Sequence, residues 1–427
     1  MIYLDHHSTT PLDPAALAAM LPLFNEQFAN AGSVTHAAGR QVAELVEQAI
    51  AQVAQALGAS AEEMVVTSGA TESNNLAIFG TCLHPRQRRR KVVSLVTEHK
   101  AVLDPLARLA QQGFEIQQLP VQFNDSPAAG AVDLQRLSEA IDEHTALVTV
   151  MLANNEIGVL QPLEQIASMC RRVDCLLHTD ATQAVGRIVV NVDALDVDLL
   201  SFSAHKFYGP KGVGGLFVRR RGRRVKLQSQ IVGGGQQHNF RSGTLNSAGI
   251  VGMQAALAAC LATLAIDQSR IASLRNRLFE LLTGELEAVC LNGPPLDNGL
   301  LHDGLLHDGS LHDGSLARGP DDSNPASGSA PPAAVPALRL AGNLNCSFYP
   351  IEGQSLMLAA PELAVSSGSA CTSANPSPSH VLQALGLSEE RARSSLRFGI
   401  GRFTTRAEIE QAAAWLVDGV RQLRQLI

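Results

Sequence analysis

Polar residues that could take part in catalysis follow five separate apolar runs of the sequence, at the point where each run ends. They carry hydroxyl, carboxylate, amide, imidazole and amine groups, which bind phosphates and move protons. The five groups lie at 68–72, 98–100, 154–156, 180–183 and 203–206. One such group alone would be explained by helix capping. Five of them at successive strand ends predict a single ligand site.

The segment 67–75, Thr-Ser-Gly-Ala-Thr-Glu-Ser-Asn-Asn, is typical of a strand end, a tight turn and a helix start. The backbone N–H groups of Ala70 and Thr71 would face outward there, where the helix dipole favours an anion. The Thr71 hydroxyl would add a donor. We predict a phosphate site, with an ordinary helix cap as the alternative. No Gly-Lys-Ser/Thr follows, so this is not the phosphate loop of nucleotide hydrolases.

Lys206 and Asp180 are the charged residues best suited to bind a cofactor. Lys206 follows a largely apolar run, and a partly desolvated lysine near a phosphate can lose its proton and form a Schiff base. Asp180 also follows an apolar run, where a carboxylate needs a partner such as a protonated pyridine nitrogen. A surface lysine and a helix cap are the alternatives. Separated by 26 positions, the two residues resemble a pyridoxal phosphate site.

Cys371 lies in a loop at about 366–380 that is rich in Ser, Gly and Pro, whereas most of the other six cysteines lie in apolar or helical surroundings. An exposed thiol can ionise and attack, while a buried one behaves as a small hydrophobic group. We interpret Cys371 as a nucleophile, with an incidental surface cysteine as the alternative. The sequence has no C-x-x-C pair, so it predicts neither a disulfide framework nor a structural zinc site.

Strand-like runs alternate with helical stretches between residues 40 and 220, which predicts a largely parallel sheet covered by helices. The runs are 64–67, 92–96, 146–152, 175–178, 199–203 and 215–218. The helix predicted at 42–57 has the apolar spacing of one buried face. Ligands bind at the carboxyl ends of the strands in such sheets, which is where the five polar groups fall.

After about residue 250 the pattern changes to long helices with shorter strands. We predict a large cofactor-binding domain at 13–250 and a small domain made of 1–12 and 251–427. Residues 296–337 repeat Leu-His-Asp-Gly three times before a Pro/Ser/Ala/Gly tract, which predicts a low-complexity insertion. Evenly spaced histidines in a Gly-rich repeat do not predict a metal site, because the ligand geometry is not preformed.

Composition and charge exclude several classes of protein. A chain of 427 residues exceeds one ordinary core, and a net charge of −7 argues against a nucleic-acid binder. The first residues lack the basic flank and apolar stretch of a signal peptide, and the most apolar run, 251–266, falls short of a bilayer span. We therefore predict a cytoplasmic protein with no nucleic-acid or membrane partner.

Over nearly the whole chain except the insertion, the sequence resembles the cysteine desulfurases of the NifS/IscS type. The matching segments are 3–5, 67–75, 98–102, 154–158, 178–183, 203–212, 233–236, 241–244, 366–373 and 397–405. The resemblance implies an α/β protein of the fold-type I pyridoxal phosphate transferases, with a mostly parallel seven-stranded sheet and a smaller α/β C-terminal domain. The sequence departs from many members at residues 6–8, His-His-Ser.

The resemblance also implies the role of each cofactor-binding residue. Lys206 would bind pyridoxal phosphate, and Asp180 would keep its ring nitrogen protonated. Gln183 would hydrogen-bond the phenolic oxygen, and His99 would stack on the ring and move protons. The phosphate would be bound by Ala70, Thr71, Ser203 and His205, with Thr244 reaching over from the other subunit of a homodimer.

The substrate implied by the resemblance is L-cysteine, from which the enzyme takes sulfur and leaves L-alanine. Arg397 and Asn155 would bind its carboxylate, and Asn155 would also contact the cofactor. Cys371 would carry the sulfur as a persulfide to acceptors such as an iron–sulfur scaffold protein. No resident metal is implied, only a transient iron–sulfur contact through Cys371. Selenocysteine lyase or another lyase or aminotransferase of the same fold is the second interpretation, and a non-catalytic scaffold is the third.

Overall fold

The computed structural model describes residues 1–296, 338–367 and 378–426, and its largest element is a seven-stranded sheet. The strands are β2 (Met64–Thr67), β3 (Lys91–Leu95), β4 (Glu115–Leu119), β5 (Thr145–Thr149), β6 (Leu176–Asp180), β7 (Leu199–Ser203) and β8 (Gly214–Val218). Their order is β2-β8-β7-β6-β5-β3-β4, and only β8 runs antiparallel to its neighbours. The predicted α/β class with a mostly parallel sheet is confirmed.

The burial of each strand explains whether it could be predicted from the sequence. Every residue of β2, β3, β5, β7 and β8 is buried, so these strands are mostly apolar and do not alternate between apolar and exposed polar residues. Strand β4 lies at the edge of the sheet, and most of its residues are exposed or half-buried. Its sequence, Glu-Ile-Gln-Gln-Leu, carries too few apolar residues to predict a strand.

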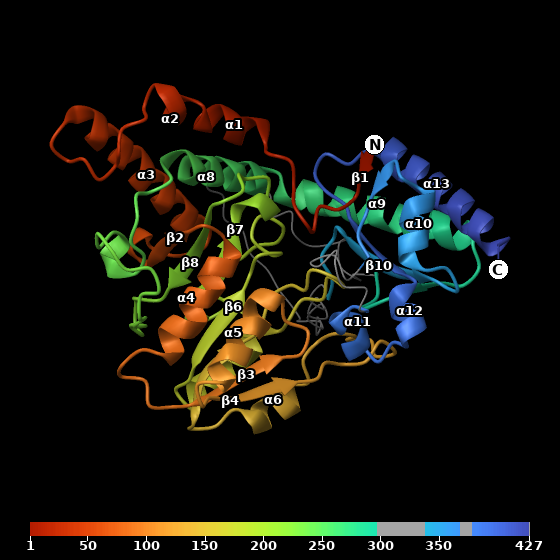
Figure 1. Cartoon of the computed structure of the whole chain (residues 1–427), viewed down its shortest axis with the longest axis horizontal. Coiled ribbons are helices and arrows are strands. Elements are labelled where there is room, and N and C mark those ends of the chain that lie inside the picture. The colour runs from red at the N-terminus through yellow and green to blue at the C-terminus, as the bar shows by residue number, and fades with distance from the viewer. Residues whose placement is uncertain (297–337, 368–377, 427) are drawn as a thin grey trace, which may run out of the picture.

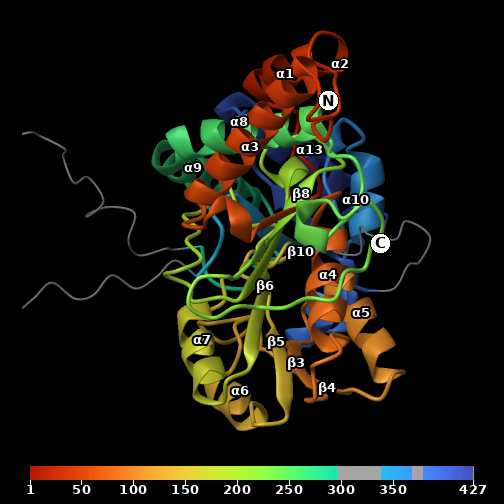
Figure 2. The ribbon, with the colours of Figure 1, turned by 90° about the vertical axis from the view of Figure 1, so that its left-hand side faces the viewer.

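Helices cover both faces of this sheet. They are α3 (Ala37–Ala56), α4 (Ala70–Cys82), α5 (Lys100–Ala110), α6 (Leu134–Ala140), α7 (Leu163–Arg172) and α8 (Ser247–Ala262). Figure 2 shows α4 and α5 on one side of the sheet and α6 and α7 on the other. Helix α3 packs on α8 through buried residues that include Val42, Val46 and Val53, which are members of its predicted apolar face. The N-terminal helices α1 (Pro14–Met20) and α2 (Pro22–Asn25) also pack on α8.

A second, three-stranded sheet has its own core. It consists of β9 (Val289–Leu291), β10 (Asn343–Phe348) and β12 (Ser395–Gly399), with β10 in the middle and antiparallel to both. Around it lie α9 (Leu264–Glu285), α10 (Gly353–Ala359), α11 (His380–Ala384), α12 (Glu389–Arg393) and α13 (Arg406–Arg424). The N-terminal β1 (Ile2–Tyr3) pairs with β11 (Leu363–Ala364) beside it. Both ends of the described chain therefore lie in this part of the molecule (Figure 1).

Two segments near the predicted domain boundaries can be compared with the cores in which they pack. Ile2 and Leu4 belong to the core around the second sheet, which agrees with the assignment of 1–12 to the small domain. Helix α8 packs in the core of the large sheet, although the predicted boundary at 250 assigns most of it to the small domain. The division stays a prediction, and the predicted insertion lies outside the described residues except for Leu296.

No single helix among the described residues has the length and apolar character needed to cross a membrane. Helices α8 and α9 meet these criteria only when they are taken together, across a bend of 73°.

Candidate active site

The strand order brings the predicted polar groups to one edge of the large sheet. Strands β3, β5, β6 and β7 are parallel neighbours, and β2 runs in the same direction because both β2 and β7 are antiparallel to β8. The carboxyl ends of these five strands therefore lie at the same end of the sheet, which is where α/β sheets bind ligands.

A cradle of backbone N–H groups lies between the start of α4 and the end of β7. Gly69, the residue before α4, has a φ of 148° and no side chain to cap the helix. A Cβ atom at Gly69 would lie 3.3 Å from the Ser203 hydroxyl oxygen, so glycine keeps this space open. The helix itself offers no acceptor to the N–H groups of Ala70 and Thr71, because they belong to its first turn. The cradle can therefore bind an anion.

Lys206 lies directly after β7, in a single helical turn (Ala204–Lys206). Its amine donates to the backbone carbonyl oxygens of His7 and Ser8, both at 2.7 Å. The guanidinium of Arg187 donates to the carbonyl oxygen of Lys206 itself, at 3.1 and 3.3 Å. Because Arg187 also donates to the backbone oxygen of His6, the N-terminal segment contacts the Lys206 amine directly and the Lys206 backbone through Arg187.

Asp180, at the end of β6, is a buried carboxylate whose hydrogen-bond partners in the described chain are neutral. Its Oδ2 accepts from Asn74 Nδ2 at 2.7 Å, and its Oδ1 accepts from the backbone N–H of Thr182 at 2.9 Å. Asn74 is completely buried in α4 and was not predicted as a site residue. Asn74 lies within the predicted phosphate segment 67–75, but no local pattern links it to Asp180.

His7 organises the inner end of the site. Its ring Nδ1 lies 2.9 Å from Gln183 Oε1, and its backbone oxygen accepts from Gln183 Nε2 at 2.9 Å. Burial, reinforced by the cations of Arg187 and Arg397, holds the pKa of His7 well below its usual value, so the ring is neutral. His7 belongs to the segment that departs from the family pattern. The predicted contact of Gln183 with the cofactor stays a prediction.

His99 and His205 flank the site. The Nδ1 of His99 accepts from the backbone N–H of Ala101 at 3.0 Å, which places the proton of the neutral ring on Nε2. His205 Nδ1 lies 3.1 Å from the Thr9 hydroxyl. Burial, with a contribution from Lys206, lowers the pKa of His205 to about 4. Thr244 is exposed on the surface of the chain, and its contribution to a partner subunit stays a prediction.

Arg397 projects from β12 of the second sheet and is 4% exposed. Its Nη2 donates to Asp5 at 2.9 Å, to the Ser8 hydroxyl at 2.7 Å and to the Ser366 hydroxyl at 3.2 Å. Its Nη1 donates to the backbone oxygen of Asn155 at 3.2 Å, so the structure brings this predicted pair together. The Nε of Arg397 is buried without a partner in the described chain, and a substrate carboxylate would supply one. The ion pair with Asp5 was not predicted.

A buried carboxyl group, Glu156, lies after β5 and contacts the element that follows the cysteine loop. The hydroxyl of Ser379 donates to Glu156 Oε2 and also accepts from the first N–H groups of α11. Burial raises the pKa of Glu156 to about 7, although Ser379 and Arg397 oppose the rise. Glu156 belongs to the predicted polar group 154–156, but the sequence interpretation gave it no role of its own.

Cys371 lies outside the described residues, so its predicted role is not tested by the structure. The six other cysteines are free, and five are buried. Burial raises the pKa of the Cys82 thiol to about 12 and that of Cys260 to about 11. Such thiols are poor nucleophiles. Cys290 is exposed and provides a matched control for Cys371.

The residues present fit pyridoxal phosphate. The cradle at Gly69 suits a phosphate, and a protonated ring nitrogen would provide Asp180 with a partner of opposite charge. Two buried polar atoms near Asp180, Asn74 Oδ1 and Thr182 Oγ1, have no partner in the described chain. Among all the residues that the structure describes, no three His, Cys, Asp or Glu side chains are grouped so that they could hold a metal ion.

Comparison with known proteins identifies the family. The model of the aminotransferase class-V family matches residues 2–295. A curated relative, cysteine desulfurase IscS of Anaeromyxobacter sp. (strain Fw109-5), is 44% identical over 425 residues, which cover 100% of this chain and 94% of that protein. This chain belongs to the cysteine desulfurase family of class-V aminotransferases.

Other known proteins match over most or all of their length as well. A probable mitochondrial cysteine desulfurase of Dictyostelium discoideum is 42% identical and matches 100% of this chain and 84% of that protein. A solved NifS-like protein superposes with a TM-score of 0.81 at 29% identity and covers 100% of both chains. SspA in complex with cysteine superposes with a TM-score of 0.73 at 29% identity, over 95% of this chain and 100% of that one. The resemblance drawn from the sequence motifs is confirmed.

Proposed function

We propose that this protein is a pyridoxal phosphate-dependent cysteine desulfurase that converts L-cysteine to L-alanine and carries the sulfur on Cys371. The observation that supports this most is the position of Ser8. Its backbone oxygen accepts from the Lys206 amine and its hydroxyl accepts from Arg397, each at 2.7 Å. The amine that would bind the cofactor and the cation that would bind the substrate carboxylate therefore meet at one residue.

The chain's own groups hold the cofactor in this proposal. Lys206 would bind it covalently, and the N–H groups of Ala70 and Thr71 would bind its phosphate. When bound, pyridoxal phosphate supplies an aldehyde and an electron-accepting ring. Asp180 would accept a hydrogen bond from the protonated ring nitrogen, while Asn74 keeps that carboxylate in place.

Arg397 and His99 would act on the substrate. The planar guanidinium suits a carboxylate, and Asp5 and Ser366 fix its orientation by binding Nη2. His99 would stack on the ring and move protons; because its Nδ1 accepts from Ala101, Nε2 carries a proton and acts as a donor toward the site. Proton transfer of this kind contributes about 10²–10⁴ in rate.

Cys371 would perform the sulfur transfer. Its thiolate attacks the substrate sulfur, so a sulfur–sulfur bond forms while the carbon–sulfur bond breaks. The electron pair of the broken bond stays on carbon, which takes up a proton and becomes the methyl group of alanine. The persulfide then passes its outer sulfur to an acceptor thiol. We include iron–sulfur scaffold proteins among the acceptors.

A pair of cysteine variants tests the proposal. Cys371→Ala should retain the visible absorption of the bound cofactor and lose sulfide release from L-cysteine in the presence of a reductant. Cys290→Ala changes another exposed thiol and should retain both. Sulfide release by Cys371→Ala at the wild-type rate would contradict the persulfide step and favour a lyase of the selenocysteine type.

We also propose a cytoplasmic homodimer. Several large apolar side chains are exposed on and just after α1 and α2, namely Leu17, Leu21, Phe24, Phe28 and Val34. Phe24 and Phe28 are 62% and 73% exposed, which is typical of a surface that is buried by association. Light scattering of the purified protein should give twice the mass of 45.2 kDa.

A further inference from the structure

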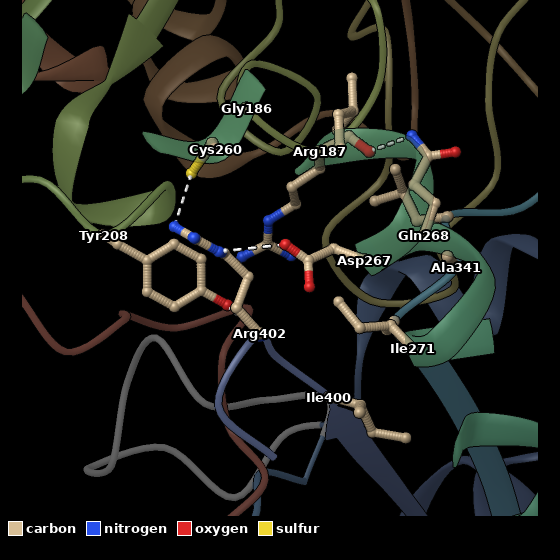
Figure 3. A pocket seen from close by; sticks show the side chains of 13 residues that line it. Gly186, Arg187, Tyr208, Cys260, Asp267, Gln268, Ile271, Ala341, Ile400 and Arg402 are labelled. Atoms are coloured by element: carbon tan, nitrogen blue, oxygen red, sulfur yellow. Dashed lines mark hydrogen bonds and ion pairs between the residues drawn. The ribbon is translucent and has the colours of Figure 1, made fainter. Parts of the chain in front are cut away.

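A cavity of about 40 Å³ lies between the two sheets, beside the bend from α8 to α9 (Figure 3). This volume holds about three water-sized groups at about 10–15 Å³ each. Leu264, Ile271, Leu340 and Ile400 contribute apolar walls. Figure 3 shows that charged side chains from three different segments also extend into the cavity.

The charges lining the cavity do not cancel. Arg187 and Arg402 line it together with one carboxylate, Asp267. Asp267 is shared, because it accepts from Arg402 Nε at 3.2 Å and from Arg270 at 3.3 Å. Arg402 also pairs with Asp13 at 3.1 Å. Asp13 and Asp267 together thus balance Arg270 and Arg402, and among the residues that the structure describes no carboxylate forms an ion pair with Arg187.

The partners of Arg187 in the described chain are neutral. Its guanidinium donates to the backbone oxygens of His6 and Lys206 and lies 2.7 Å from the neutral ring of His7. Burial lowers the pKa of Arg187, which means that its surroundings disfavour the charged form. A bound anion would remove that penalty.

The other ionisable groups in the cavity wall do not supply the missing charge. Burial raises the pKa of Cys260 to about 11 and also raises that of Tyr208, so both are neutral at pH 7. The Cys260 thiol donates to the backbone oxygen of Phe207 at 3.4 Å. Arg402 Nη2 has no hydrogen-bond partner in the described chain and is a second donor for a ligand.

We propose that this cavity binds one small monovalent anion of halide or formate size, held by Arg187 and Arg402. The cavity volume limits the ligand to a few heavy atoms, and the single uncompensated cation sets its charge. The apolar walls disfavour strongly hydrated anions such as sulfate. Binding here is separate from the proposed sulfur chemistry, so failure of either proposal leaves the other standing.

Thermal unfolding and crystallography with bromide test the proposal directly. The full-length holoenzyme is melted in gluconate, an anion too large for the cavity, and then in bromide, formate or sulfate at equal ionic strength. Bromide and formate at ten times their dissociation constants should raise the Tm by about 2 °C relative to gluconate. Bromide-soaked crystals should show one anomalous peak within hydrogen-bond distance of Arg187.

Two variants of different kinds guard against misfolding as the explanation. Arg187→Gln removes the charge, and Ala341→Val, at another lining residue, fills the cavity without changing charge. Both should abolish the Tm response to bromide, while Arg277→Gln, outside the lining, should retain it. Equal melting in bromide and gluconate, a response that survives Ala341→Val, or water alone in the cavity of the soaked crystal would each overturn the proposal.

Discussion

Glu156 allows a quantitative prediction about pH. It is 5% exposed, and burial raises the pKa of its carboxyl from 4.5 to about 7 in the folded protein. Between these two values the folded state binds more protons than the unfolded state. The free energy of unfolding therefore falls as pH rises through this window and levels off above it. The difference between the two pKa values corresponds to about 3 kcal/mol.

Glu156→Gln should remove this dependence, because glutamine does not ionise and still offers an oxygen to Ser379. We expect the stability of the variant relative to the wild type to rise by up to about 3 kcal/mol between about pH 5 and about pH 8. Urea unfolding at several pH values measures this difference. Glu98, whose pKa burial also raises, is present in both proteins and cancels.

A matched control for this experiment is Glu47→Gln, which changes an exposed carboxyl group on α3 and should leave the pH dependence unaltered. A difference between Glu156→Gln and the wild type that stays constant over the whole pH range would refute the reasoning. It would mean that Glu156 ionises in the folded protein as readily as it does in the unfolded chain.

Three further substitutions test the site. Asn74→Ala removes a hydrogen bond to a charged carboxylate, and such a bond is worth about 1.5–3 kcal/mol. Absorbance titrations should therefore show that pyridoxal phosphate binds roughly 10–100-fold more weakly. An unchanged affinity would exclude Asn74 from holding Asp180. Gly69→Ala places a methyl group in the cradle at a φ of 148°, and should weaken cofactor affinity about 10-fold or more through strain of about 1–3 kcal/mol. Arg397→Lys should raise the KM for L-cysteine about 10-fold while the cofactor spectrum stays the same, and an unchanged KM would place the substrate carboxylate elsewhere.

The fold was predictable where burial is complete. The fully buried strands β2 and β7 coincide with the apolar runs predicted at 64–67 and 199–203, because both faces of the sheet are covered at these strands. Strand β12 was not predicted, because its sequence, Ser-Leu-Arg-Phe-Gly, has Arg397 at its centre. Arg397, which interrupts the apolar pattern of this strand, is also the residue proposed to bind the substrate carboxylate.

The candidate site was predictable where a strand end alone positions a residue, as for Asp180 and Lys206. The residues that hold those groups were missed because they meet them only in the folded chain. Asn74 lies 106 positions before Asp180, and Asp5 lies 392 positions before Arg397. No local pattern links residues at such separations, so the first pair emerges only where α4 packs on β6 and the second only where the N-terminal segment lies beside β12.

The most direct test of the account follows sulfur and carbon together. The purified holoenzyme is incubated with isotopically labelled L-cysteine without any acceptor, alanine is quantified, and the cysteine peptides are mapped by mass spectrometry. We predict one alanine per active chain and one additional labelled sulfur atom on the peptide that contains Cys371. Alanine without a labelled Cys371 peptide, or the extra sulfur on a different cysteine, would contradict the central claim.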